Sequence, residues 1–376
     1  MPIWASRGNR LAYLCGRRVE APAGGTASAL CVVDARGERR RVVARGVVVG
    51  AGVSSETTGA VWSPRARELA YAGSEGIFVV GADGRGRRRV ARTARRLAIN
   101  SLAWSANGPR LVFTETIPQN DLEIYTVAAE GSGVKRLTRN DVDDLQPSWA
   151  PDGRRLAFVR LTAARPARPD IWVMNADGSG QRRVRRNGVE PSWTSDGSRI
   201  VFTRFGTEPG STYSVSVSTG REQLLVSGGF HGAPSPDGTK LAFVRGSIED
   251  YHVFIAAADG SGETSLARGG GPLSWSPDSS SLLFSGCARG SACTVRVDGS
   301  GVRQIPIAEP WGGAYSYSPD GTALTFSSGT GYPTSQIEVS GVDALGRRVI
   351  TAALGRNTDP DWQPLPALNR RASGGA

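Results

Sequence analysis

Histidines and catalytic motifs are scarce in this chain, which limits the chemistry that its side chains could perform. The sequence of 376 residues contains two histidines, His231 in a glycine-rich connector and His252 within an alternating strand pattern. A zinc site needs three or four convergent ligands, so two isolated histidines do not predict a transition-metal centre. The sequence also lacks a Gly-x-Ser-x-Gly elbow, a phosphate-binding glycine loop and a His-Glu-x-x-His motif. We therefore expect no catalytic residue, no bound cofactor and no enzyme activity.

Acidic residues are the remaining group with metal-binding chemistry. Asp141, Asp143 and Asp144 lie close together in one connector, and Glu190 and Asp359 lie in equivalent connectors. Oxygen ligands of this kind suit Ca²⁺. Aspartate is also common in solvated turns, where its carboxylate accepts hydrogen bonds from turn amides. These residues are accordingly weak metal candidates, and we expect no metal to be bound.

A repeated block determines which elements carry these residues. Its clearest copy covers 147–158 and reads PSWAPDGRRLAF. Eight copies begin near Trp4, Trp62, Trp104, Trp149, Trp193, Pro234, Trp275 and Tyr317. Successive copies start 41 to 58 residues apart, and most spacings are close to the period of a four-stranded propeller blade.

Each unit contains four β signals separated by turn residues. In one unit these signals are the Trp149 segment, 155–159, 171–174 and 182–184. The Pro-Asp-Gly turn supplies a preset φ, a side-chain acceptor and a residue that adopts positive φ. Because a single sheet cannot bury both of its faces, successive sheets must stack around an axis. The chain is predicted to be all-β, a closed β-propeller of about eight four-stranded antiparallel blades. The repeated Trp is interpreted as packing between blades, with a ligand cage as the alternative.

The repeated block resembles the TolB-like β-propeller repeat, which is similar to the WD repeat but distinct from it. The residues that carry the resemblance are W-S-P-D-G-x-x-L-A-F followed by I-W-V-M-N-A-D-G-S-G-x-R-R-V, and they recur along almost the whole chain. The resemblance implies a propeller, and TolB itself is a periplasmic component of a cell-envelope protein network. This chain has eight repeats rather than six and shows no separate N-terminal domain. We therefore carry over the fold and not the role.

The end of the chain offers a means of closing the ring. Residues 359–364 repeat the innermost-strand signature with no further strands after them. We expect the segment near Trp362 to supply or complete the innermost strand of the blade that contains 10–14. Residues 1–366 would then form one propeller domain. Residues 367–376 lack apolar periodicity and are predicted to be a disordered tail.

The four cysteines occupy matched positions in two units. Cys15 and Cys31 fall in the second and third strands of the first unit, and Cys287 and Cys293 do the same in the seventh. Each pair would lie across one hairpin, so two disulfides are predicted and a periplasmic or extracellular location is favoured. Four reduced, packed thiols are the alternative, which would leave a cytoplasmic location open.

Export and membrane signals are absent from the sequence as given. It has no run of apolar residues long enough to span a bilayer and no apolar leader behind Met1. Because the chain begins almost inside a repeat, we expect an export segment to lie upstream.

Positive charge dominates the composition. The chain has 45 Lys and Arg against 34 Asp and Glu, a net charge of +11, and all but two of the cations are arginines. These arginines recur at one place in several repeats, as at 86–90, 181–184 and 346–349. We expect them to ring the molecule and to protect exposed sheet edges, not to bind nucleic acid. A nucleic-acid partner, the alternative, predicts affinity that falls steeply with salt.

Propeller loops on one rim vary freely while the strands stay fixed, which suits recognition of a peptide or protein. Phe230 and Trp311 are predicted to be exposed anchors or plugs of the channel mouth, and His231, Glu190 and Asp359 are further rim candidates. The predicted function is a monomeric, non-catalytic scaffold that binds a protein, peptide or cell-envelope component through this rim. The alternative is a propeller enzyme, a lyase or hydrolase with an acidic or metal-assisted site at the channel mouth.

Overall fold

The structure is a computed structural model. It describes residues 3–4, 10–20, 26–34, 38–49, 60–64, 67–73, 75–92, 99–117, 121–164, 167–205, 210–247, 250–287, 291–306, 315–318, 321–329, 335–342 and 348–349. Every regular element in these residues is a β-strand. In the same residues no helix is long and apolar enough to cross a membrane.

The strands of the N-terminal third form one eight-stranded sheet and one four-stranded sheet. The first sheet contains β1 (Ile3–Trp4), β2 (Arg10–Glu20), β3 (Thr26–Asp34), β4 (Arg41–Val49), β5 (Ala60–Trp62), β6 (Glu68–Gly73), β7 (Gly76–Gly81) and β8 (Arg88–Arg92). The next contains β9 (Ile99–Trp104), β10 (Arg110–Thr116), β11 (Leu122–Ala128) and β12 (Lys135–Arg136). The eight-stranded sheet consists of two four-strand units that meet at a single pair, Val47 of β4 with Gly73 of β6.

Five further four-stranded sheets follow in chain order. Their strands are β13 (Asp144–Trp149), β14 (Arg155–Leu161), β15 (Pro169–Asn175), β16 (Arg182–Arg186); β17 (Val189–Trp193), β18 (Arg199–Arg204), β19 (Ser211–Ser216), β20 (Glu222–Val226); β21 (Gly229–Pro234), β22 (Lys240–Ser247), β23 (Asp250–Ala257), β24 (Thr264–Arg268); β25 (Gly270–Trp275), β26 (Ser281–Ser285), β27 (Ser291–Arg296), β28 (Arg303–Pro306); and β29 (Tyr315–Tyr317), β30 (Ala323–Gly329), β31 (Ser335–Gly341), β32 (Arg348–Val349). Within each of them, consecutive strands pair antiparallel, as the four β signals per repeat predict.

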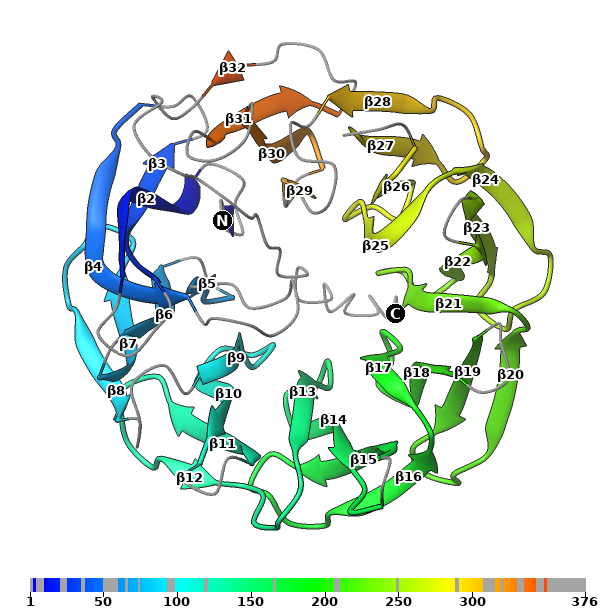
Figure 1. The fold of residues 1–376 in the computed structure, drawn as a ribbon, viewed down its shortest axis with the longest axis horizontal. Helices are drawn as coiled ribbons and strands as arrows, with labels where there is room; N and C mark the ends of the chain where they lie inside the picture. Colours follow the sequence, from blue (N-terminus) through cyan, green and yellow to red (C-terminus); the bar gives the residue numbers. More distant parts are fainter. Residues whose placement is uncertain are drawn as a thin grey trace, which may run out of the picture.

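The sheets stand around a common centre (Figure 1). The first strand of a unit, such as β13 or β17, faces the centre, and the last, such as β16 or β20, lies on the outline. Each chain segment therefore runs outward through one sheet and returns to the centre to begin the next.

The repeated turns fold as their residues predict. Asp152 accepts a hydrogen bond on Oδ1 from the amide of Arg154 (2.8 Å), and Gly153 adopts a φ of +66°. The second turn also fixes the spacing of neighbouring sheets. A Cβ on Gly260 would lie 2.1 Å from the carbonyl oxygen of Leu225 in the preceding sheet, so this position requires glycine.

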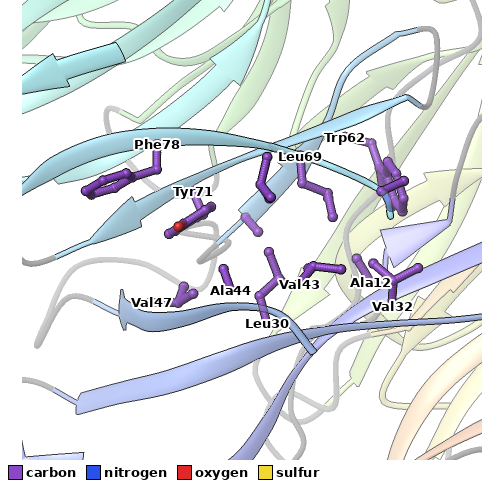
Figure 2. Close-up of a cluster of buried hydrophobic side chains, with 13 residues drawn as sticks. Ala12, Leu30, Val32, Val43, Ala44, Val47, Trp62, Leu69, Tyr71 and Phe78 are labelled. Carbon is purple, nitrogen blue, oxygen red and sulfur yellow. The ribbon is translucent and has the colours of Figure 1, made fainter. Parts of the chain in front are cut away.

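Apolar side chains fill the space between neighbouring sheets. Figure 2 shows one such cluster, in which Leu30 and Val43 from the β1–β4 unit face Trp62, Leu69 and Phe78 from the β5–β8 unit. Clusters of the same kind join the later sheets. The hydrophobic core is therefore a series of layers between sheets, which agrees with the stacking that the repeats predict.

The repeated Trp contributes both packing and a hydrogen bond between sheets. The indole Nε1 of Trp104, Trp193 and Trp275 donates to the backbone carbonyls of Val61, Ser148 and Ala233 at 3.1, 3.1 and 2.9 Å. Each acceptor lies one residue before the equivalent repeat position in the preceding sheet. The predicted role in packing between blades is confirmed for these three residues.

A ring pair with an arginine above it occupies the middle of three consecutive sheets. The pairs are Phe158 with Trp172, Phe202 with Tyr213 and Phe243 with Phe254, at centroid distances of 6.4, 5.8 and 5.4 Å. The guanidinium groups of Arg160, Arg204 and Arg245 lie 4.5, 4.3 and 5.0 Å from the second ring of each pair. The arrangement places a cation on an aromatic face, where the ring quadrupole attracts it.

Both cysteine pairs form disulfides, and one cysteine of each pair occupies the position that the second ring has in these sheets. Cys31 pairs with Tyr13 across the strands, where other sheets have the second ring, and Cys15 stands two residues after Tyr13, where they have arginine. In the β25–β28 sheet Cys293 pairs with Phe284 in the same way and is bonded to Cys287. The Cα atoms of the two bridges are 5.9 and 6.2 Å apart.

The first and last sheets of the chain share a small core. Leu11, Tyr13 and Val33 cluster with Val339 of β31, and Ala323 packs against them. The predicted closing segment near Trp362 and the predicted tail at 367–376 lie outside the described residues.

Candidate functional site

The innermost strands are interrupted at one recurrent position. In β13, β17 and β21 two residues oppose one residue of the neighbouring strand, so each innermost strand carries a bulge. The first bulged residues are Gln146, Glu190 and His231, with φ values of +51°, +57° and +55°. Non-glycine residues rarely adopt this left-handed conformation, and it persists where the surrounding structure enforces it. Bulges and strained residues of this kind are frequent at functional sites.

The three bulged residues contact one another across three sheets. The amide of Glu190 donates to Oε1 of Gln146 (3.2 Å). The Nδ1 atom of His231 lies 3.0 Å from each carboxylate oxygen of Glu190. Thr203 Oγ1 donates to Glu190 Oε2 (3.1 Å) and accepts from the amide of His231 (3.2 Å). We call Gln146, Glu190, Thr203 and His231 the polar girdle.

The polar girdle is ordered and still accessible. The side chains of His231 and Glu190 are 37% and 32% exposed. A carboxylate that faces Nδ1 orients the imidazole and favours the tautomer with its proton on that nitrogen. The girdle can therefore accept hydrogen bonds from a ligand at Glu190, and it presents an oriented imidazole beside it.

Phe230 adds an apolar component next to the girdle. Its ring meets His231 edge to face at 5.0 Å and Tyr251 at 5.5 Å. Phe230 is partly buried, so packing holds the ring while part of it stays accessible. His252 lies elsewhere, with Nε2 3.2 Å from Asp250 on the same strand. The structure thus brings Glu190, His231 and Phe230 together, whereas the predicted rim residues Trp311 and Asp359 lie outside the described residues.

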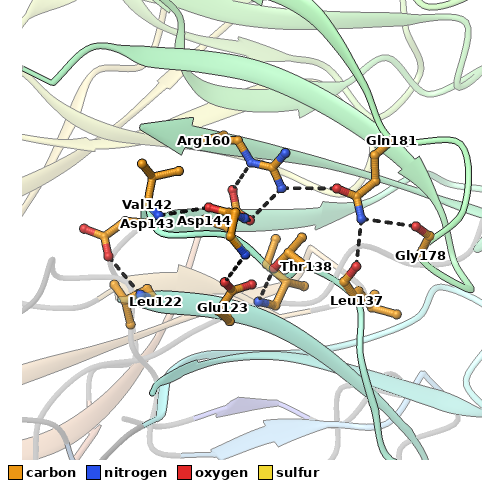
Figure 3. A network of polar contacts seen from close by, with 12 residues as sticks. Leu122, Glu123, Leu137, Thr138, Val142, Asp143, Asp144, Arg160, Gly178 and Gln181 are labelled. Atoms are coloured by element: carbon orange, nitrogen blue, oxygen red, sulfur yellow. Dashed lines mark hydrogen bonds and ion pairs between the residues drawn. The ribbon is translucent and has the colours of Figure 1, made fainter. Parts of the chain in front are cut away.

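The acidic segment predicted as a weak metal site, 141–144, makes hydrogen bonds and an ion pair within the fold (Figure 3). Asp144 is fully buried and accepts two bonds from Arg160, Nε to Oδ1 at 2.6 Å and Nη2 to Oδ2 at 2.8 Å. Asn140 donates to the same carboxylate at 2.8 Å. Burial raises the pKa of Asp144, and the hydrogen bonds and charge of Arg160 act in the opposite direction without cancelling it.

This buried pair belongs to a network that joins two sheets. Arg160 Nη2 also donates to Oε1 of Gln181 (3.1 Å), whose Nε2 donates to the carbonyl of Leu137 in the preceding sheet (2.7 Å). Asp143 accepts a bond from the amide of Leu122 (2.8 Å). Two of the three weak metal candidates are thus engaged in structural contacts. Among the described residues there is no group of three or more His, Cys, Asp or Glu side chains placed to hold a metal ion.

Sequence reasoning did not single out Gln146, Thr203 or Tyr251. A usable signal exists, because Gln146, Glu190 and His231 each stand three residues before the repeated Trp or Pro of their unit. The left-handed conformation that places them together depends on the bulge. The sequence pattern gives no sign of that bulge, since none of the three residues is a glycine.

Comparison with known proteins agrees with this architecture. A family model described as the TolB beta propeller domain matches residues 5–235, which is more than half of the chain. The chain belongs to this family.

As a TolB-family propeller it shares short stretches with curated proteins. It is 35% identical over 80 residues to a protein TolB homolog of Chlorobium luteolum, covering 21% of this chain and 17% of the homolog. It is 30% identical over 66 residues to dipeptidyl-peptidase 5 of Porphyromonas gingivalis, covering 16% of this chain and 10% of that protein. The chain thus matches less than a fifth of the length of either relative.

Solved structures with a similar fold include both enzymes and other proteins. An oligogalacturonate lyase in complex with manganese has a TM-score of 0.58 at 14% identity, over 78% of this chain and 87% of the lyase. A puromycin-hydrolyzing peptidase of Mycobacterium tuberculosis has a TM-score of 0.57 at 14% identity, over 86% of this chain and 59% of the peptidase. A eukaryotic initiation factor has a TM-score of 0.56 at 13% identity, over 96% of this chain and 99% of the factor. At these identities the likeness concerns the fold alone.

Proposed function

We propose that this TolB-family propeller is a non-catalytic scaffold that binds a protein, a peptide or a cell-envelope component through the rim that carries the polar girdle. The observation that carries the proposal is the contact between Gln146, Glu190 and His231, which come from three different sheets. Three residues with a left-handed backbone, linked to one another and partly exposed, form a surface that is organised before any ligand arrives. Preorganisation of this kind lowers the entropy cost of binding.

The chemistry of the girdle suits a peptide-like ligand. Glu190 offers carboxylate oxygens to N–H donors, and the partly buried ring of Phe230 offers an apolar contact beside it. Interface energy is often concentrated in a few such polar and aromatic residues that packing holds in place.

The proposal includes a closed ring and a location outside the cytoplasm. Residues 1–366 would form one domain of eight blades, closed by the segment near Trp362, with 367–376 as a tail. Two features favour this arrangement: the eight repeats and the cluster shared by the first and last sheets. The two disulfides favour a periplasmic or extracellular location, because such bonds persist in oxidising compartments. The protein would act as a monomer and would not bind nucleic acid.

Selection from a displayed peptide library tests the rim directly. Peptides enriched on the wild-type protein are measured against H231A and E190Q, and H252A serves as the matched control because His252 lies outside the girdle. We expect peptides whose affinity falls at least about tenfold with H231A or E190Q and stays unchanged with H252A. Enriched peptides that bind all four proteins equally would show that the ligand contacts another surface.

A propeller enzyme is the second candidate, and the pair of His231 with Glu190 favours it. An imidazole oriented by a carboxylate is an arrangement that general acid–base catalysis uses. A lyase or hydrolase of this type would process a substrate at the channel mouth, with acidic or metal assistance. Turnover of a substrate by wild type that H231A abolishes would favour the enzyme over the scaffold. Stoichiometric transition metal in the purified protein would do the same.

A further inference from the structure

Cations are distributed unevenly over the outer strands. The strands β4, β8, β12 and β16 contain eleven Lys or Arg residues and no acid. The equivalent strands β20, β24, β28 and β32 contain three cations and one acid. The first four follow one another along the outline of the molecule (Figure 1). The cations of the described outer strands are therefore concentrated on four consecutive strands and sparse on the other four, whereas the sequence led us to expect a ring without a single patch. We call the cations of β4, β8, β12 and β16 the basic arc.

Edge protection does not explain the arc. Every sheet of a propeller has an outermost strand with an unpaired edge, so protection by charge would be needed on all of them. The strand β20 has the sequence EQLLV and leaves Leu224 48% exposed without any cation. Edge protection would apply to every blade, so it cannot explain why cations are concentrated on four consecutive blades.

Tethering of neighbouring sheets explains only a few of the arginines. Arg41 Nη1 donates to the carbonyl of Asp83 in the next unit (2.8 Å), and Arg88 Nε donates to that of Ala129 (3.0 Å). In the β17–β20 sheet the neutral Gln223 makes the equivalent bond to Asp259 (3.1 Å). The tether thus does not require a positive charge.

Much of the charge in the arc is not neutralised. Five of the eleven cations form ion pairs, namely Arg88, Arg89, Arg136, Arg183 and Arg185. Within the described part of the chain the other six take part in none. Of these, Arg45, Arg92, Lys135 and Arg186 have exposed side chains and lie on four successive outer strands.

We infer that the basic arc binds a flexible linear polyanion that bears carboxylate or phosphate groups and no aromatic bases. Guanidinium groups match such anions with paired hydrogen bonds. The arc follows the convex edge of the molecule, so a flexible chain can contact all four strands whereas a stiff duplex touches only a short part. Single-stranded nucleic acids bind through aromatic stacking platforms. Among the described residues the exposed large apolar side chains in or next to the arc strands are Val42 in β4 and Val134 just before β12, neither of them aromatic.

Two charge-matched variants test the inference with alginate as the carboxylate probe and polyphosphate as the phosphate probe. The arc variant is R45Q/R92Q/K135Q/R186Q. The control variant, R221Q/R268Q/R296Q/R303Q, removes four exposed cations elsewhere. Thermal unfolding of both confirms that they fold. We expect wild type to bind at least one probe, with affinity that falls with salt. The arc variant should bind about tenfold or more weakly and lose about 3 from the slope of log affinity against log salt, whereas the control should stay close to wild type.

The relative affinity for the two probes identifies the anion that the arc prefers. Equal losses in the two variants would mean that net charge alone attracts the polymer, and would overturn the inference. Tighter binding of duplex DNA than of either probe, or no binding of either probe at low salt, would overturn it as well. The inference does not depend on the polar girdle, so we expect H231A to bind both probes like wild type.

Discussion

At the scale of single residues, the structure explains why tryptophan stands where the repeat begins. Phenylalanine would fill the same space between sheets, but it has no donor for the carbonyl of the preceding sheet. Trp104, Trp193 and Trp275 make that bond. The indole nitrogen of Trp149 is buried and has no hydrogen-bond partner among the described residues. The same residue type therefore occurs with and without the bond in one molecule.

This difference allows the bond to be measured. Trp193→Phe removes ring area and the hydrogen bond to Ser148, whereas Trp149→Phe removes ring area alone. We expect Trp193→Phe to lower the free energy of unfolding by about 1 kcal/mol more than Trp149→Phe, the usual net value of one hydrogen bond. Urea unfolding of the two variants gives the comparison. Equal losses would show that packing alone explains the tryptophan.

The turn aspartates make stability depend on pH. The hydroxyl of Ser179, followed by its amide, donates to Asp177 and holds the pKa of that carboxyl below its ordinary value, and Ser261 does the same for Asp259. A depressed pKa in the folded state means that this stabilisation is present above the unfolded pKa of about 3.9. It is lost as the pH falls through the lower, folded-state value.

Removal of one hydroxyl should shift one titration. In Ser179→Ala we expect the pKa of Asp177 to rise towards its ordinary value while that of Asp259 stays the same. Ser261→Ala should have the reverse effect. Carboxyl chemical shifts followed by NMR between acidic and neutral pH report both groups. A rise of both values in either variant would indicate a global change and not the loss of one bond.

At the scale of elements, two sheets replace a ring–arginine arrangement with a covalent bond. The chain-entropy model assigns roughly 3 kcal/mol to a loop such as that from Cys15 to Cys31, and roughly 2 kcal/mol to the shorter loop from Cys287 to Cys293. We expect C15S/C31S and C287S/C293S to lose stability in that order, as measured by unfolding without reductant. The same measurement with reductant should lower wild type to the level of the combined variant.

The replacement also predicts a partial rescue. C15R/C31F restores a ring beside Tyr13 and an arginine above it, as in the sheets where Arg160 and Arg204 lie over ring pairs. It should unfold at higher denaturant than C15S/C31S. A variant no more stable than C15S/C31S would mean that this site no longer accommodates the noncovalent arrangement.

Particular elements show what the sequence could predict. The strand expected at 155–159 is present as β14 (Arg155–Leu161), because a short apolar run that follows a turn is a local signal. The girdle at Glu190 depends on a bulge and on contacts with residues more than forty positions away. Both cysteine pairs could be paired from the sequence because each spans one hairpin. The unneutralised charge of the basic arc could not be recognised, since a run of arginines does not reveal which of them form ion pairs with residues elsewhere in the fold.

At the scale of the whole molecule, the proposed closure can be tested by two truncations. Loss of residues 357–376 should remove the closing segment, expose an innermost strand of the first sheet and lower the midpoint of thermal unfolding by several degrees. Loss of 367–376 alone should have little effect, which makes it the matched control. Identical midpoints for the two truncated chains would place the closing segment elsewhere.

The single backbone pair between Val47 and Gly73 makes the contact between the first two units different from those between later sheets. Elsewhere in the described part of the chain, neighbouring sheets contact each other without strand pairing. Here one bridge joins β4 to β6, so the units β1–β4 and β5–β8 share a backbone contact that the other neighbouring sheets lack. Hydrogen exchange should therefore protect these two units with one common opening free energy, as a single foldon twice the size of each later one.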